Sequence, residues 1–317
     1  MADIRVNLNP TVAARWRLFH LTNRRRETLV AYLFLSPWIL GFLIFLVGPM
    51  LASLYLSFTQ YKVIRAPVWL GLANYERMLA DELFYHALKV TVTYTAISVP
   101  LGIMAALGVA ILLNQKIIAS GVFRTIFYLP SIISGVAVAI VFAWIFNFRF
   151  GILNYLLSLA GIAGPNWLGS PRWVLWAFIM MSLWGIGANV VIFLAALQGV
   201  PQTFYEAAEI DGAGSWRRFW YITLPLISPA LLFVFIIGII GTFQTFTQSY
   251  ILTGGGPANA TLFYLLYLYK NAFNWFEMGY ASALAWVLFL IIMSCTLILL
   301  RSSAQWVYYE GGLGGRR

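Results

Sequence analysis

Residues 278–300 read MGYASALAWVLFLIIMSCTLILL, a stretch without a charged side chain. A helix crosses the hydrocarbon core of a bilayer with about 20 predominantly apolar residues, so this stretch predicts a transmembrane helix. Five further uncharged runs of at least that length precede it in the chain. We therefore expect an all-α polytopic membrane protein with six transmembrane helices, at residues 29–58, 87–113, 122–147, 172–198, 226–251 and 279–300.

The composition supports this fold class. The chain has 317 residues, of which 62% are hydrophobic and 9% charged, whereas a soluble domain carries about 25% charged residues. Residues 150–171 are also uncharged, but their Asn, Gly and Pro residues would leave backbone groups unpaired in lipid, and we interpret them as a loop. Residues 59–86 carry balanced charges and indicate an ordinary solvated loop.

The basic residues predict the orientation. With six spans, 13 of the 20 Lys and Arg residues lie on the side shared by both termini and 7 on the other. Cytoplasmic loops carry the excess of basic residues, so both termini are expected in the cytoplasm. The chain then divides into a cytoplasmic N-terminal segment, 1–28, a transmembrane domain, 29–301, and a cytoplasmic tail, 302–317.

The net charge of +10 does not indicate a nucleic-acid partner, because the basic residues lie in short segments beside the apolar runs. The arginine cluster at 24–26 is interpreted as a topology anchor, with binding to anionic lipid or RNA as the alternative.

Several kinds of chemistry are disfavoured. No acidic residue lies within a predicted span, whereas gradient-driven transporters usually keep one there. No lysine belongs to a phosphate-binding G-x-x-x-x-G-K-[ST] loop. Cys295 is the only cysteine, and His20 and His86 are expected on opposite sides of the membrane. We therefore expect no metal site, no catalytic nucleophile and no enzymatic activity in this chain.

The most informative loop is EAAEIDGAGSWRRFWYITLP, residues 206–225. Residues 201–211 predict a short helix, and Gly212 and Gly214 predict a tight reversal. Trp216 and the aromatic residues after it recur at helical spacing until Pro225, which predicts a second short helix. Such a knob can enter a cleft in another protein. The alternative is an amphipathic loop on the membrane surface.

This loop resembles the EAA loop of ABC importer permeases. The matching residues, together with the glycine of the reversal, are Glu206, Ala207, Ala208, Asp211, Gly212, Ala213, Gly214, Leu224 and Pro225. The resemblance implies a type I importer fold in which residues 199–225 form the coupling loop. That loop would dock into a cytoplasmic ATPase subunit, whose closure on ATP and Mg would move the helices; no cofactor is expected in this chain.

A second resemblance covers residues 27–311. The segments 250–259, 271–273, 277–282 and 306–310 are similar to the carbohydrate branch of that family. The branch implies import of a sugar, oligosaccharide or related polyol across the cell membrane of a prokaryote. It also implies a second permease subunit, two copies of the ATPase subunit and an extracytoplasmic sugar-binding protein. The main alternative is a gradient-driven transporter or channel acting without an ATPase, and a membrane-bound enzyme is a third.

A sugar pathway needs uncharged polar groups and aromatic rings on inward helix faces. In the helix predicted at 226–251, helical spacing lets most of the polar groups share one face. Gly185 and Gly187 thin the preceding helix, so that a ligand or another backbone could approach. The candidate pathway residues are Thr242, Gln244, Thr245, Gln248, Trp184, Asn189 and Ser131, with packing between helices as the alternative for each. In maltose-type members the resemblance places sugar contacts at Thr242 and Thr245, where threonine replaces the expected asparagine, so the specificity is expected to differ.

Overall fold

The computed structural model describes residues 23–115 and 118–308, so most of the predicted N-terminal segment and part of the tail lie outside the described residues. The chain forms two compact units, Met1–Tyr55 and Leu56–Arg317. The first contains α2 (Asn23–Phe42), the π-helical turn η2 (Leu43–Val47) and the start of α3 (Gly48–Ser57).

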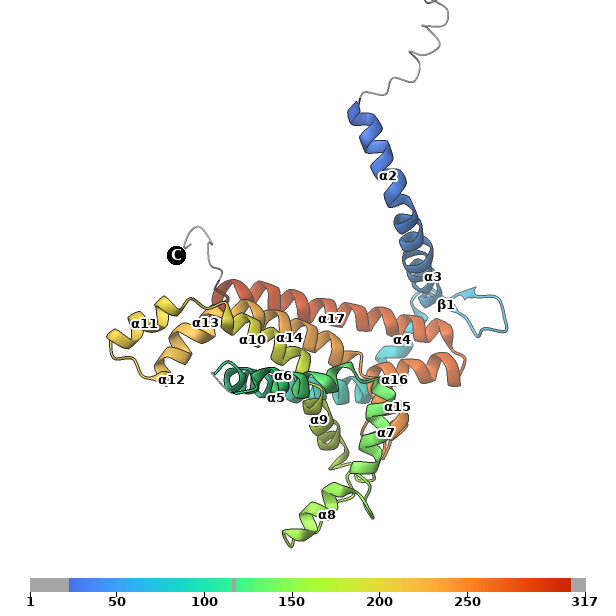
Figure 1. Ribbon diagram of the computed structural model, residues 1–317. Helices are drawn as coiled ribbons and strands as arrows, with labels where there is room; N and C mark the ends of the chain where they lie inside the picture. The colour runs from blue at the N-terminus through green and yellow to red at the C-terminus, as the bar shows by residue number, and fades with distance from the viewer. Residues whose placement is uncertain (1–22, 116–117, 309–317) are drawn as a thin grey trace, which may run out of the picture. The chain divides into compact units, whose positions relative to one another are not determined.

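The second unit begins with a short hairpin and a long helix (Figure 1). Strand β1 (Thr59–Gln60) pairs antiparallel with β2 (Val68–Trp69), a small addition to the predicted all-α class. Helix α4 (Ala73–Leu79) then leads to α5 (Glu82–Leu113). Asp81 caps α5, because its carboxylate accepts hydrogen bonds from the first free amides of the helix.

The helix predicted at 122–147 consists of two helices that meet at a sharp bend. Helix α6 (Ser120–Tyr128) and the 3₁₀ turn η3 (Leu129–Ile132) lie at 99° to α7 (Gly135–Ile145). Pro130 lies in η3, and Ile133 and Ser134 are extended, so the helical hydrogen bonds cannot continue.

The helix predicted at 172–198 is also bent. Helices α9 (Val174–Trp184) and α10 (Gly187–Gln198) meet at 49°. Between α7 and α9, the segment predicted as a loop contains α8 (Ile152–Leu159).

The remaining elements follow in chain order. They are α11 (Gln202–Ile210), α12 (Ser215–Arg218), the π-helical turn η4 (Phe219–Thr223), α13 (Leu224–Leu226), α14 (Ser228–Phe243), α15 (Thr247–Leu252), α16 (Tyr264–Tyr269), the π-helical turn η5 (Lys270–Asn274) and α17 (Met278–Trp306).

Within residues 23–115 and 118–308, four helical segments are long and apolar enough to cross a membrane. They are Glu27–Ser57, Glu82–Leu113, Ser228–Leu252 and Met278–Trp306. The two bent pairs pass the same criterion only when each pair is taken together, so the count reaches six if each pair is one span. The six predicted spans therefore correspond to these four segments and two bent pairs.

Helix α5 is the centre of the second unit, where it packs against α9, α10, α14 and α16. Ala106 and Ala110 of α5 are fully buried beside Val190 and Phe193 of α10, since small residues let two helices approach closely. Figure 1 shows α11 and α12 at one end of this bundle, and α4 and α16 at the other. The segment 206–225 and the segments 271–273 and 277–282, all singled out in the sequence, thus lie at opposite ends of the bundle.

Candidate functional site

Helices α11 and α12 form a hairpin, here called the coupling hairpin, residues 202–218. The amide of Gly212 bonds to the carbonyl of Glu209 at 3.0 Å, and that of Ala213 bonds to Ala208 at 2.8 Å. These two bonds form a Schellman motif, which needs a left-handed residue after the helix. Gly212 supplies it with φ of +76°.

The predicted role of Gly214 in the reversal is wrong. Gly214 has φ of −67° and ψ of 165°, an extended conformation open to any residue, and it precedes α12. Its missing Cβ would meet no atom within 4 Å. The reversal therefore depends on Gly212 alone.

Pro225 does not end the second arm, contrary to the prediction. The chain stays helical from α12 through η4 and α13, and Pro225 lies in the first turn of α13. Proline lacks an amide hydrogen, and it is tolerated there because the preceding π-helical turn η4 already departs from the i→i−4 hydrogen-bond pattern. Leu224 packs against the buried cluster around Phe193, so Leu224 and Pro225 connect the hairpin to the core.

The two arms of the hairpin are joined by side chains. The hydroxyls of Tyr205 in α11 and Thr223 in η4 are 2.9 Å apart and share a hydrogen bond. Arg218 lies 3.4 Å from the carboxylate of Glu209, an exposed ion pair that adds little stability. Tyr205 also packs against the core cluster of α5 and α10. Tyr205 thus connects α11 both to η4 and to the core.

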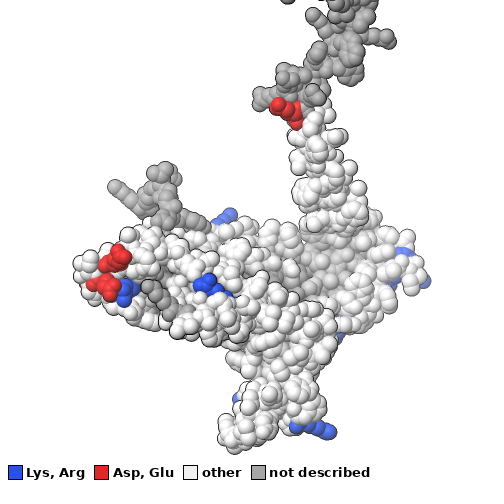
Figure 2. Space-filling model, in the orientation of Figure 1, with Lys and Arg blue, Asp and Glu red and all other residues white. Residues whose placement is uncertain are grey.

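The tip of the hairpin is accessible. Glu206, Ala207, Asp211 and Gly212 are exposed, and Ala208 and Ala213 are half-buried. Figure 2 shows the acidic side chains of this face of the second unit gathered over α11. Two large apolar side chains accompany them, since Ile210 is 88% exposed and Trp216 is 74% exposed. An exposed mixture of acids and large apolar groups is suited to docking with another protein.

The predicted polar face of the 226–251 helix is not continuous. Helix α14 ends at Phe243 and α15 begins at Thr247, so helical spacing does not hold from Thr242 to Gln248. Gln244 and Thr245 lie in the break. The prediction of one face was wrong because it assumed an unbroken helix.

Five of the seven predicted pathway residues nevertheless line two neighbouring cavities. Thr242 and Asn189 line a cavity of about 140 Å³ between α5, α9, α10 and α14. Gln248, Trp184 and Ser131 line a cavity of about 230 Å³. Ser182 and Gly185 line both cavities, which are therefore adjacent.

The polar groups of these cavities differ in their bonding. Thr242 donates to the carbonyl of Gly238 at 2.8 Å, so its oxygen still accepts hydrogen bonds. The hydroxyl of Ser98, in the smaller cavity, is buried and has no partner among the described residues. Sequence analysis missed Ser98, although the spacing of Tyr94 and Ser98 puts both on one face of α5 and both line these cavities.

Gly187 serves close packing of backbones. A Cβ at this position would lie 2.1 Å from the carbonyl oxygen of Phe127 and 2.8 Å from the Cα of Tyr128. The absence of a side chain at Gly187 thus lets the backbone of α6 pack closely against α10, whereas Gly185 lines both cavities.

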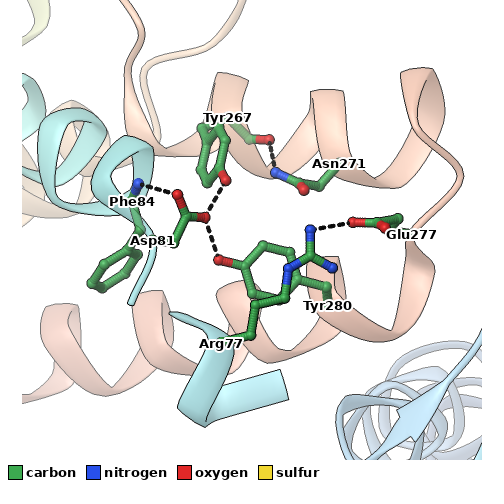
Figure 3. Close-up of polar contacts among 7 residues, drawn as sticks. All are labelled: Arg77, Asp81, Phe84, Tyr267, Asn271, Glu277 and Tyr280. Carbon is green, nitrogen blue, oxygen red and sulfur yellow. Dashed lines mark hydrogen bonds and ion pairs between the residues drawn. The ribbon is translucent and has the colours of Figure 1, made fainter. Parts of the chain in front are cut away.

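At the opposite end of the bundle lies a polar cluster, the Asp81 junction, formed by Arg77, Asp81, Tyr267, Glu277 and Tyr280 (Figure 3). One carboxylate oxygen of Asp81 accepts hydrogen bonds from the hydroxyls of Tyr267 and Tyr280, while the other caps α5. Arg77 pairs with Glu277 at 2.6 Å and lies 4.3 Å from the ring centre of Tyr280. The expectation of an ordinary solvated loop over 59–86 missed this cluster, because its partners lie almost 200 positions away.

The hydrogen bonds of the junction stabilise the ionised carboxylate. Partial burial of Asp81 acts to raise its pKa, but the hydroxyls of Tyr267 and Tyr280 and the amides of Phe84 and Leu83 outweigh it. The net result is a pKa below the usual value for aspartate. Asp81 therefore stays charged at neutral pH.

Over the described ranges 23–115 and 118–308, no three His, Cys, Asp or Glu residues lie close enough together to hold a metal ion.

Comparison with known proteins identifies the family. The family of binding-protein-dependent transport system inner membrane components matches residues 98–307, which contain the coupling hairpin and every residue lining the two cavities except Tyr94. The chain belongs to this family. The prediction of an ABC importer permease is thereby confirmed, and such a permease is a transport subunit rather than an enzyme.

Individual relatives agree with this assignment. The permease shares 46% identity with YesP of Bacillus subtilis (strain 168), a probable ABC transporter permease protein, over 90% of this chain and 94% of YesP. It shares 33% identity with the sulfoquinovosyl glycerol transport system permease protein SmoG of Agrobacterium fabrum, over 87% of this chain and 90% of SmoG.

A solved structure shares the fold. It is a chain of the bacterial alginate ABC transporter, crystallised in complex with an alginate pentasaccharide-bound periplasmic protein. The match has a TM-score of 0.77 and 25% identity, and it covers 89% of this chain and 96% of that chain. These relatives do not favour the alternative of a gradient-driven carrier.

Proposed function

We propose that this permease is one of two permease subunits in an ATP-driven importer of a sugar, oligosaccharide or related polyol. Two copies of a cytoplasmic ATPase subunit supply the energy, and an extracytoplasmic binding protein delivers the substrate. The observation that carries the proposal is the coupling hairpin, which presents the EAA residues on an exposed tip and is joined to the core through Tyr205.

Energy enters at the hairpin. Ile210 and Trp216 dock into a groove of the ATPase subunit, which moves when the two ATPase subunits close on ATP and Mg. The Schellman turn at Gly212 keeps the hairpin from deforming during this movement. The displacement passes to η4 and α14 through the hydrogen bond between Tyr205 and Thr223. ATP and Mg bind the partner, since this sequence has no phosphate-binding loop.

The membrane arrangement is proposed from the helices and the distribution of basic residues. We infer that each bent pair, α6 to α7 and α9 to α10, is one span, which gives six spans with the hairpin on the side of both termini. The 13 to 7 distribution of basic residues supports a cytoplasmic position for that side. The Asp81 junction and α8 then lie on the extracytoplasmic side.

The substrate class is supported by the cavities and by the relatives. The cavity walls combine hydroxyls, amides and rings, from Ser98, Asn189, Thr242, Trp184 and Gln248, without a charged side chain. These groups can replace the water lost by a sugar as it crosses. The names of SmoG and of the alginate transporter show that carbohydrate derivatives are carried within the family.

Purification from native membranes tests the proposal. We expect the permease to co-purify with an ATPase subunit and a second permease subunit, and the ATPase activity of that complex to rise with the substrate-loaded binding protein. A chain that is isolated without an ATPase under mild conditions, and that imports solute by itself, would contradict it.

A further inference from the structure

The segment between α7 and α9 carries an exposed apolar helix face. Ile152, Leu156 and Leu159 of α8 are 45%, 54% and 69% exposed. Their spacing of i, i+4 and i+7 puts them on one side of the helix. On another side, Leu153 and Leu157 pack against a buried cluster of the core, which fixes α8 in place. The exposed face is therefore rigid and without a partner in the described parts of the chain.

A groove of about 630 Å³ lies beside this face, between the end of α7 and α8. Four aromatic side chains line it, and each is more than half exposed: Trp144, Phe148, Phe150 and Tyr155. Arg149 lies among them and forms no ion pair with any described residue. The groove thus combines apolar walls with one cation.

The charged residues of the segment that forms the groove have one sign. Arg149 and Arg172 are the only charged residues between 146 and 173, and no acidic residue occurs from 83 to 205. An anionic ligand complements this segment. A protein partner would have to bring its own acids and an apolar face, whereas a phospholipid supplies phosphate and acyl chains in one molecule.

The apolar surface also continues from a helix assigned to the membrane. Ile140, Val141 and Trp144 of α7 are exposed and lead to the groove. Figure 1 shows α8 beyond the ends of α7 and α9 that lie farthest from α11. Eight residues of helix extend only about 12 Å, too short to span a bilayer, so α8 is suited to lie in the interface plane.

We propose that the groove and α8 bind a phospholipid of the leaflet opposite the coupling hairpin. Arg149 pairs with the phosphate, the aromatic rings surround the glycerol region, and Ile152, Leu156 and Leu159 lie among the acyl chains. The inference rests on the proposed membrane arrangement and not on coupling to ATP, so failure of one leaves the other standing.

Spin labels test the position of α8 in the complete transporter. Because Cys295 is the only cysteine of this chain, the Cys295→Ser background allows a single label in this subunit at Leu156→Cys, with the partner subunits made free of reactive cysteines. The matched control is Ile64→Cys, in the loop between β1 and β2, where Ile64 is 92% exposed. In nanodiscs containing dioleoylphosphatidylglycerol, we expect the label at 156 to be relaxed by oxygen and shielded from a water-soluble nickel chelate. The label at 64 should show the reverse. Nickel accessibility at 156 equal to that at 64 would overturn the proposal, and so would shielding from both reagents, which would indicate a covering protein.

Lipid titration tests the groove. Native mass spectrometry of the complex with added dioleoylphosphatidylglycerol measures the dissociation constant of the tightest-bound lipid. Loss of one charge-assisted hydrogen bond in Arg149→Gln should weaken it about tenfold. Arg65→Gln removes an exposed cation from the β1–β2 loop and should leave it unchanged. Wild-type affinity in Arg149→Gln, or equal weakening in both variants, would rule out the groove as the site.

Discussion

Tyr280, in the first turn of α17, donates a hydrogen bond of 2.6 Å to the carboxylate of Asp81, which lies 199 positions earlier and caps α5. The same oxygen accepts from Tyr267 of α16. The carboxylate of Asp81 thus joins the start of α5 to α16 and to the start of α17 (Figure 3). The proposed importer requires long helices that move as rigid bodies, and this junction holds their ends together away from the coupling hairpin.

The first prediction concerns Asp81→Asn. Charge-assisted hydrogen bonds are stronger than neutral ones, so the variant should lose about 1–2 kcal/mol of stability at pH 7. The lowered pKa of Asp81 means that its contribution is complete above the unfolded-state pKa of about 3.9 and is lost as pH falls through the folded value. The melting temperature of the wild type should therefore decline more steeply below about pH 4 than that of the variant. Glu82→Gln, which changes an exposed neighbouring acid, is the control. Parallel pH curves for wild type and Asp81→Asn would argue against the junction.

The second prediction compares two glycines of the hairpin. Gly212→Ala forces a side chain into a left-handed conformation and should cost about 1 kcal/mol locally. Gly214→Ala changes an extended residue with open space around it and should have no effect. We expect weaker ATPase association and slower uptake only in Gly212→Ala, measured by co-purification and transport assays. Equal behaviour of the two variants would show that the Schellman turn is irrelevant to docking.

The third prediction concerns the bond between the arms. Tyr205→Phe removes the hydroxyl that bonds to Thr223, an interaction worth about 1 kcal/mol. ATPase association should persist while the amount of solute imported per ATP falls severalfold. Tyr221→Phe removes a hydroxyl from a side chain that is 77% exposed and serves as the control. An unchanged import ratio in Tyr205→Phe would leave this bond without a role in coupling.

The fourth prediction addresses the cavity with two matched threonines. Thr242 and Thr296 each donate to the carbonyl four residues earlier at 2.8 Å, but Thr242 also lines a cavity. Thr242→Val removes an acceptor for a sugar hydroxyl and should raise the substrate concentration for half-maximal uptake about threefold to tenfold. Thr296→Val should leave it unchanged. A shared effect would indicate a structural role for both residues instead of a pathway role for Thr242.

The fifth prediction tests the close contact between α10 and α6. Gly187→Ala would put a Cβ 2.1 Å from a backbone oxygen that cannot move freely, so the yield of monodisperse protein should fall strongly. Gly241→Ala, in α14 with nothing within 4 Å, should be neutral or stabilising by up to about 1 kcal/mol. Size-exclusion profiles and melting temperatures provide the measurement. Normal folding of Gly187→Ala would mean that the two backbones do not approach as described.

Sequence analysis predicted the helical class and the hairpin because both follow from local patterns. Long uncharged runs that are free of clustered Asn, Gly and Pro indicate spans, and Gly212 follows a helix whose cap needs a left-handed residue. The bend at 185–186 was missed, since apolar composition does not distinguish a straight span from a broken one. The break at 244–246 was missed for the same reason, and it separated Thr245 from the face assigned to it.

Contacts between distant segments could not be read from the chain. Nothing in the sequence near Asp81 predicts Tyr267 or Tyr280 as its partners. Ser98 lies in an apolar run, and its place in a cavity depends on how α9 and α14 pack against α5. α8 was interpreted as loop because Gly and Pro surround it, although residues 152–159 are themselves helix-compatible and amphipathic.

Uptake into sealed proteoliposomes most directly tests whether energy enters through the coupling hairpin. Vesicles would contain either this permease with its partner permease and ATPase subunits, or this permease alone, with the loaded binding protein supplied outside and ATP inside. The account predicts carbohydrate uptake only in the complete assembly. This uptake should stop when ATP is withheld, and it should be slower in Gly212→Ala, in line with the weaker association of that variant with the ATPase. Equal uptake by the permease alone, without nucleotide, would contradict it.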